Sequence, residues 1–199
     1  MSFVDLPDVF IGSTTDAHTF VVLNRQLPGA KRTLTDAGFT AREYNECTVY
    51  LLPPGTPEEA NERAGCAMYG LLARTHDLVD LSWTTRCSPQ GPLPPSDLRI
   101  QFTGGTVSAT AETDEGRRLL EQHGFTRSPD DSSYRPPSGL DERGLLSAVV
   151  RAESHAYADG LGVHVDLGIL TPDAIPVTPR RASSSVPGPA TKPGRGRTR

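Results

Sequence analysis

The tripeptide V-D-L at 79–81 recurs at 165–167, where it places an acidic group next to a histidine. His164 and Asp166 are two residues apart, so in an extended strand both side chains point to one face. An imidazole beside a carboxylate is the arrangement of a base with its orienting acid, or of two metal ligands. However, Leu78 stands where His164 falls in the other copy, and no His or Cys has zinc-like spacing. We therefore favour a solvated strand face over a catalytic or metal-binding role.

Asp80 and Asp166 are the equivalent acids of the two V-D-L copies. If the copies are related by pseudo-symmetry, the two carboxylates can meet across a cleft, as acid–base catalysis or a divalent cation requires. The alternative is an ordinary amphipathic strand in which Val and Leu point inward and Asp points outward. This second interpretation is the stronger one. Asp80, His164 and Asp166 are thus weak catalytic candidates, and we expect no metal and no cofactor.

No other motif predicts an enzyme. Gly104-Gly105 and Gly160-x-Gly162 match neither the dinucleotide fingerprint nor the P-loop, and turn or helix-end positions account for both. The serines lack the G-x-S-x-G context of a nucleophile elbow. Cys66 falls at a helical position among alanines, where we expect a buried and unreactive thiol.

An internal repeat is the strongest architectural signal. Residues 30–81 recur, in degraded form, at 116–167. A Gly-Phe pair, a tyrosine, a Pro-Pro pair and V-D-L follow in the same order in both copies. In the first copy we expect a hairpin over 9–11 and 18–23, a helix from 28, a strand over 48–52, a helix from 56 and a strand over 79–83. In the second we expect a hairpin over 98–102 and 106–111, a helix from 113, a weak strand at 134, a helix from 141 and a strand over 163–170.

The fold class that follows is α/β, with mixed sheets in two pseudo-symmetric hairpin-helix-strand-helix-strand repeats. The domain boundaries are 1–85 for the first repeat, 86–96 for a Pro-rich linker, 97–170 for the second repeat and 171–199 for a disordered basic tail. A pseudo-twofold arrangement with abutting sheets satisfies this pattern.

Charge divides the chain into an acidic body and a basic tail. Residues 171–199 hold six basic residues and one acid, a net charge of +5, whereas residues 1–170 have a net charge of −9. Such a tail can contact nucleic acid without sequence preference, through phosphate contacts, and the alternative is a tail that only solubilises or screens the acidic body. The residues concerned are Arg180, Arg181, Lys192, Arg195, Arg197 and Arg199.

Localisation and assembly follow from weaker signals. The acidic start does not fit a signal peptide, and no apolar stretch is long enough to span a membrane. The number and spacing of the three cysteines do not fit a disulfide framework. We expect a cytoplasmic protein that does not bind membranes and is a monomer or a homodimer.

The repeat pattern resembles that of uncharacterised α/β repeat proteins of high-GC actinobacteria, often carried on plasmids and integrating elements. The positions that carry this resemblance are Leu34, Gly38, Phe39, Tyr50, Pro53, Gly55 and Asp80 in the first copy, and Leu120, Gly124, Phe125, Tyr134, Pro137, Gly139 and Asp166 in the second. The resemblance covers about two thirds of the chain and transfers no catalytic residue. What it implies is an accessory or regulatory protein of a mobile genetic element.

The leading functional hypothesis is a non-enzymatic interaction module, in which the acidic body binds an unidentified protein partner and the basic tail touches nucleic acid. A small hydrolase or metal-assisted enzyme that uses a cleft between the repeats is one alternative. A small-molecule-sensing domain is another, by analogy with other duplicated α/β lobes.

Overall fold

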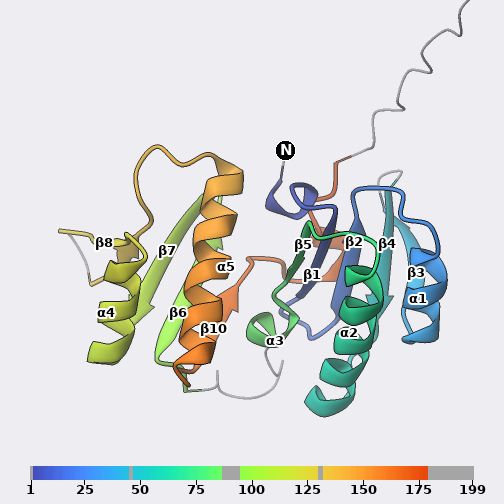
Figure 1. Ribbon diagram of the computed structural model, residues 1–199, viewed down its shortest axis with the longest axis horizontal. Helices are drawn as coiled ribbons and strands as arrows, with labels where there is room; N and C mark the ends of the chain where they lie inside the picture. The colour runs from blue at the N-terminus through green and yellow to red at the C-terminus, as the bar shows by residue number, and fades with distance from the viewer. Residues whose placement is uncertain (1, 45–46, 87–94, 130–131, 179–199) are drawn as a thin grey trace, which may run out of the picture.

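The computed structural model describes residues 2–44, 47–86, 95–129 and 132–178 (Figure 1). It contains two five-stranded mixed sheets with helices packed against them, which confirms the α/β class. The first sheet has the strand order β3-β4-β2-β1-β5, and the second has the order β10-β6-β7-β9-β8. Read from the outer edge inward, these two orders are the same, so the repeat in the sequence is a repeat of topology.

The first repeat follows a short 3-10 turn, η1 (Phe3–Asp5). Its elements are β1 (Val9–Ser13), β2 (Thr19–Leu23), α1 (Ala30–Asp36), β3 (Thr40–Tyr44), β4 (Cys47–Leu52), α2 (Pro57–Leu72) and β5 (Leu78–Asp80). Helix α2 begins as its sequence predicts, because the Thr56 hydroxyl accepts a hydrogen bond from the Glu59 N–H at 3.2 Å and Pro57 occupies the first turn. Its alanines face the sheet, but Cys66 is exposed, so the expectation of a buried thiol is wrong.

A four-residue helix, α3 (Ser82–Thr85), connects the first repeat to the segment before the second. The second repeat consists of β6 (Leu98–Thr103), β7 (Thr106–Ala111), α4 (Asp114–Gln122), β8 (Thr126–Arg127), β9 (Tyr134–Arg135), α5 (Glu142–Ala158) and β10 (Val163–Asp166). The β6–β7 hairpin turns at Gly104 and Gly105, whose φ angles of 55° and 82° are those of a two-residue turn that favours glycine.

Several predicted boundaries need correction. Each repeat has one more strand than predicted, β3 and β8, directly after the Gly-Phe pair; both are exposed edge strands without apolar alternation. The closing strands end at Asp80 and Asp166 instead of continuing to residues 83 and 170. Most of the predicted linker, residues 87–94, lies outside the described residues.

The two sheets are covered differently. In the first sheet nearly every residue of β1 and β2 is buried, because α1 and α2 cover one face and other parts of the chain cover the other. In the second sheet Leu98, Ile100 and Phe102 are buried under α4 and α5, while Gln101 and Thr103, which point to the other face, are exposed. The face of the second sheet that points away from its helices is therefore polar.

The second face of the first sheet is covered by the segment after β10, residues 167–178, which we call the C-terminal strap. It includes the turn η2 (Pro172–Ala174), and its buried side chains are Leu167, Ile169, Ile175 and Val177. The strap packs closely on Gly12, where a Cβ atom would lie 2.9 Å from Leu167 Cδ1. The predicted start of the tail at residue 171 is therefore too early, since 171–178 belong to the folded body.

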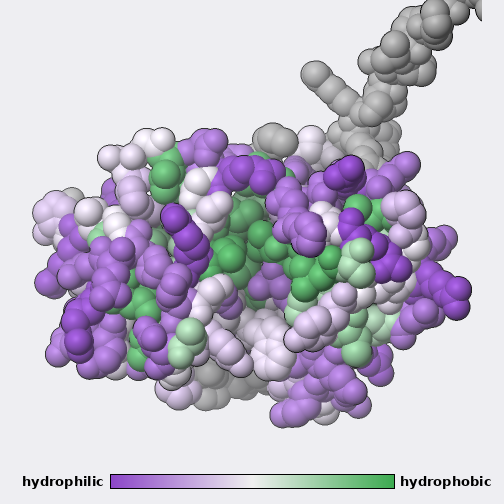
Figure 2. Space-filling model, in the orientation of Figure 1, coloured by the Kyte–Doolittle hydropathy of each residue, from purple (hydrophilic) through white to green (hydrophobic). Residues whose placement is uncertain are grey.

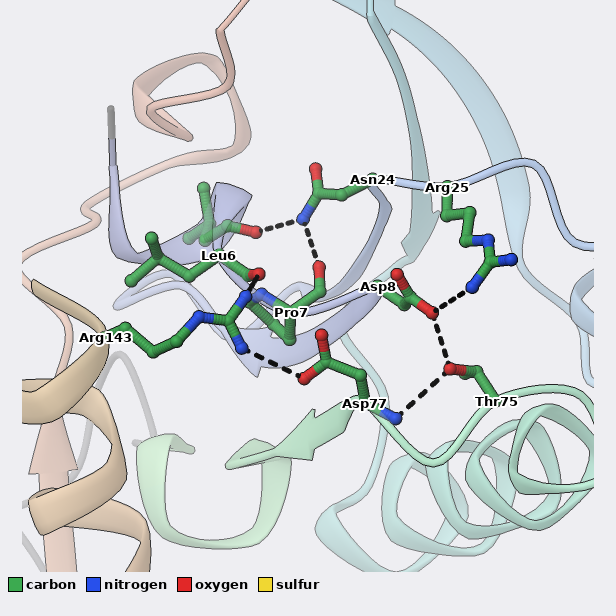
Figure 3. A network of polar contacts seen from close by, with 9 residues as sticks. Leu6, Pro7, Asp8, Asn24, Arg25, Thr75, Asp77 and Arg143 are labelled. Carbon is green, nitrogen blue, oxygen red and sulfur yellow. Dashed lines mark hydrogen bonds and ion pairs between the residues drawn. The ribbon is translucent and has the colours of Figure 1, made fainter.

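The repeats share one hydrophobic core as well as polar contacts. The ring of Phe3 lies 4.7 Å from that of Phe102, and both belong to a cluster that draws residues from both repeats. In Figure 3, Arg143 of α5 reaches the first repeat, donating to the Leu6 carbonyl and lying 3.4 Å from the Asp77 carboxylate. Figure 1 shows β5 and β10 next to this junction, with β3 and β8 at the outer ends.

Candidate functional site at the junction of the repeats

The two V-D-L aspartates have the same local role. Asp80 Oδ1 accepts a hydrogen bond from the Ser82 N–H at 2.8 Å, and Asp166 Oδ1 accepts one from the Gly168 N–H at 2.8 Å. This turn, in which a carboxylate caps the backbone two residues later, diverts the chain and ends the strand. The primary role of the aspartate in each copy is therefore to end the strand.

The structure places Asp80 and Asp166 in different surroundings. Asp80 lies in register with Ile11, in the row that faces α1 and α2, and its charged neighbours are Arg86 and Glu153. Asp166 lies in register with Gln101, on the polar face of the second sheet. The proposed meeting of these two carboxylates across a cleft is not what the structure shows.

His164 and Asp166, by contrast, line one pocket of about 260 Å³, which we call the junction pocket. Residues of both repeats form it, because the β1–β2 loop, α3, β6, β10 and the strap meet there. Its lining consists of Ser13, Thr15, Thr85, Arg99, Ile100, Gln101, His164, Asp166, Leu167 and Ile169. The sequence predicted that His164 and Asp166 share a face, but it gave no indication that Arg99 or Thr85 joins them.

His164 is only 6% exposed, so the expectation of a solvated strand face is wrong for this residue, and its surroundings favour the neutral ring. Burial lowers the pKa of His164; the Asp166 carboxylate opposes this effect, Arg99 adds to it, and a contact with the Thr84 backbone opposes it. At neutral pH the neutral imidazole therefore has one protonated and one unprotonated nitrogen.

Three polar groups of the pocket have unused hydrogen-bonding capacity. Within the described part of the chain, neither the Arg99 guanidinium nor the Gln101 amide has a hydrogen-bond or ion-pair partner. Asp166 uses one carboxylate oxygen for the Gly168 N–H, which leaves Oδ2 unused among the same residues. A half-buried cation, an amide and a carboxylate oxygen are thus available to a bound molecule.

The wall of the pocket that α3 provides is held by buried hydroxyls. The Thr85 hydroxyl accepts from the Ser13 N–H at 2.8 Å and donates to the Leu81 carbonyl at 2.7 Å. The Ser13 hydroxyl lies 3.4 Å from both the Thr19 hydroxyl and the Ser82 carbonyl. These contacts occupy Ser13 structurally, and none of them is to a base that would activate it as a nucleophile.

A second feature lies on the helical side of the junction. Asp80, at the end of β5, and Glu153, on α5, come from different repeats and lie close enough to influence each other. Burial raises the pKa of Asp80, with hydrogen bonds from Ser82 and the charge of Arg86 opposing. Burial also raises the pKa of Glu153, the charge of Asp80 raises it further, and hydrogen bonds from Ser154 and Thr84 oppose. Carboxylates of the two repeats do influence each other at the junction, but the second carboxylate is that of Glu153 and not that of Asp166.

The surface between α5 and α2 is apolar. Figure 2 shows a hydrophobic strip in the centre of this face, flanked by polar surface. On its α5 side, between α5, β5 and the N-terminal segment, lies a pocket of about 200 Å³ with Val79, Leu146 and Val150 in its lining, together with Leu6 and Arg143. We call the region between α2 and α5, above β5 and α3, the interhelical groove.

Helix α3 separates the two features and touches both. The Thr84 side chain contacts Glu153 on the groove side, while the Thr84 backbone contacts His164. The tail residues predicted to bind nucleic acid, Arg180 to Arg199, lie outside the described residues. In the ranges that the structure describes, no helix is long and apolar enough to cross a membrane, and no group of three or more His, Cys, Asp or Glu side chains is placed to hold a metal ion.

Comparisons with known proteins add no relative. No protein-family model matches the chain, and searches of curated proteins and of solved structures find no match.

Proposed function

We propose that the protein is a non-enzymatic interaction module that binds a protein partner through the interhelical groove. The observation that carries this proposal is a pair of large aromatic side chains left in solvent on α3 and α5, two of the helices beside the groove. Trp83 on α3 is 57% exposed and Tyr157 on α5 is 75% exposed. Tyr and Trp are the residue types that most often supply binding energy in protein interfaces.

The carboxylates beneath the groove define the chemistry of the partner. Burial raises the pKa of both Asp80 and Glu153, the Asp80 charge raises that of Glu153 further, and the charge of Arg86 opposes the rise at Asp80. A Lys or Arg side chain entering the groove would offset the repulsion between the two carboxylates and form charge-assisted hydrogen bonds. The apolar strip suits the hydrophobic face of a helix. The partner segment we propose is therefore an amphipathic helix with a basic residue at the centre of its apolar face.

The basic tail forms the second part of the proposal. Residues 179–199 contain six basic residues and no acid, which supports salt-dependent contact with nucleic-acid phosphates. The protein would then connect a partner protein to nucleic acid, a role suited to the accessory protein that the sequence resemblance implies. Comparing DNA and RNA binding by the full chain and by residues 1–178 tests this part, because the shorter chain keeps the strap.

Trp83 offers a direct test of the groove, because it is the single tryptophan of the chain. Titration with a designed amphipathic helical peptide that carries one central Lys should shift Trp83 emission to shorter wavelength as the ring leaves water. Replacing that Lys by Glu should weaken binding by about tenfold or more, since like charges would meet in a desolvated site. Equal binding of both peptides, or an unchanged preference in Glu153→Gln, would refute the proposal.

A further inference from the structure

We propose that the junction pocket binds a small zwitterion, an aliphatic α-amino acid or a molecule of the same chemistry. The site is independent of the interhelical groove and involves none of the residues placed there. The pocket has charged groups of both signs, a volume that suits a small molecule and an apolar wall.

Charge complementarity selects a ligand that carries both signs. Arg99 and Asp166 lie diagonally on paired parallel strands, since Arg99 is in register with His164 and Gln101 with Asp166. Strand spacing and rise put their Cα atoms about 8 Å apart on the same face, and no ion pair joins their side chains in the described structure. A simple anion would meet the Asp166 carboxylate, and a simple cation would meet the guanidinium. A ligand with a carboxylate for Arg99 and an ammonium group for Asp166 satisfies both.

Neutral groups in the pocket can complete the recognition. The Gln101 amide stands beside Asp166 in register and has no partner among the described residues, so it can donate to a carboxylate or accept from an ammonium group. His164, Ser13 and Thr85 are each more than nine-tenths buried and line the same cavity. The polar side of the pocket is therefore built into the fold.

Size and wall composition narrow the ligand class. The cavity of about 260 Å³ has room for about nine non-hydrogen atoms if each takes the ~30 Å³ of a water molecule. Leu167 and Ile169 of the strap form an apolar wall. An α-amino acid with a branched aliphatic side chain of three or four carbons has about eight or nine non-hydrogen atoms, so valine and leucine are the probes of choice.

Binding should be measured on the full chain by isothermal titration calorimetry and by thermal unfolding. We expect L-leucine at about 10 mM to raise Tm, because a ligand that binds only the folded state stabilises it. 4-Methylpentanoate lacks the ammonium group of leucine and 3-methylbutylamine lacks its carboxylate. Each should bind at least about tenfold more weakly, because one pocket charge is left unpaired.

Matched variants assign the effect to the pocket. Arg99→Gln and Asp166→Asn should each weaken leucine binding by about tenfold or more, whereas Arg135→Gln, at an exposed arginine of β9 outside the pocket, should leave it unchanged. Asn at 166 keeps an acceptor for the Gly168 N–H, and unliganded Tm values near that of the wild type will show that the variants fold. The proposal is overturned if neither leucine nor valine binds up to about 50 mM, if the singly charged analogues bind equally well, or if Arg99→Gln and Asp166→Asn bind like the wild type.

Discussion

Asp80 and Asp166 end the closing strands of the two repeats in the same way, each carboxylate accepting the N–H of the residue two positions later at 2.8 Å. Beyond this shared turn their surroundings differ. Asp80 faces Glu153 beside the interhelical groove, and Asp166 lines the junction pocket next to His164. A duplicated structural residue has thus come to lie in two different sites, which face different ligands in our proposals.

Because each aspartate accepts a backbone N–H, we expect a side-chain acceptor at positions 80 and 166 to stabilise the folded protein. Asp166→Ala should lower the free energy of unfolding by about 1 kcal/mol, because the Gly168 N–H loses its partner, while Asp166→Asn should change it by less than about 0.5 kcal/mol. Urea unfolding at pH 7 checks both values. Equal effects of Ala and Asn would show that the hydrogen bond contributes nothing.

The Asp80–Glu153 pair predicts a pH dependence of stability. Both carboxyls have folded-state pKa values raised above the reference values of 3.8 and 4.5. They therefore hold protons in the folded protein at pH values where the unfolded chain has lost them. Their contribution favours the folded state at low pH and is lost as the pH rises through the raised pKa values.

Glu153→Gln should remove much of this effect. At pH 7 the variant should be more stable than the wild type by about 0.5–1 kcal/mol, because one of two repelling charges is gone. Its unfolding free energy should also fall less steeply between about pH 4.5 and 7, the range above the reference values of 3.8 and 4.5. Glu62→Gln, at an exposed position of α2 on the α1 side, is the control and should retain the wild-type slope. If the unfolding free energy of Glu153→Gln falls with pH as steeply as that of the wild type, the raised pKa of Glu153 is contradicted.

The strap predicts that the end of the folded body lies beyond residue 170. Ile175 is 3% exposed and Val177 is 7% exposed, and the Thr178 hydroxyl donates to Asp5 at 2.6 Å. A chain ending at Leu170 loses two buried aliphatic side chains and should be destabilised by about 3–5 kcal/mol. A chain ending at Thr178 should unfold at the denaturant concentration of the full chain. Similar midpoints for the two truncations would show that the strap does not belong to the core.

The close packing of the strap on Gly12 predicts that a side chain at position 12 destabilises the fold. A Cβ atom there would lie 2.9 Å from Leu167 Cδ1 and 3.1 Å from Phe10 Cε1, so Gly12→Ala should cost about 1–3 kcal/mol. Gly65→Ala is the matched control, because a Cβ at this position of α2 meets nothing within 4 Å. In a helix interior this second change should be stabilising by up to about 1 kcal/mol. A Gly12→Ala variant as stable as the wild type would mean that the strap sits less tightly.

The sequence predicted the elements whose signals are local. Helix caps at Thr56, Thr113 and Asp141 each accept the expected backbone N–H, and the hairpin glycines turn where predicted. Strands β3 and β8 escaped prediction because they are exposed edge strands, whose polar residues carry no alternating pattern. The end of each closing strand at its aspartate also escaped, since an Asp pointing out of a strand and an Asp capping a turn look alike in sequence.

The sites were predictable only within one element. His164 and Asp166 share a face because they are two residues apart on one strand, and this expectation holds in the structure. The approach of Glu153 to Asp80 depends on α5 packing beside α3, a contact between segments about 70 residues apart that no local pattern encodes. The burial of Ile175 and Val177 could not be predicted for a similar reason: both stand among prolines, and they join a core cluster whose other members are distant in the sequence.

Photo-cross-linking in cells that express the full chain tests the groove most directly. With a photoreactive phenylalanine in place of Tyr157, we predict a discrete protein adduct that Glu153→Lys abolishes and that Glu62→Lys, the matched change outside the groove, leaves intact. The Lys at 153 would repel the basic residue that we propose for the partner. Adduct formation that is equal in Glu153→Lys and Glu62→Lys, or that is absent altogether, would contradict the proposal that the interhelical groove binds a partner.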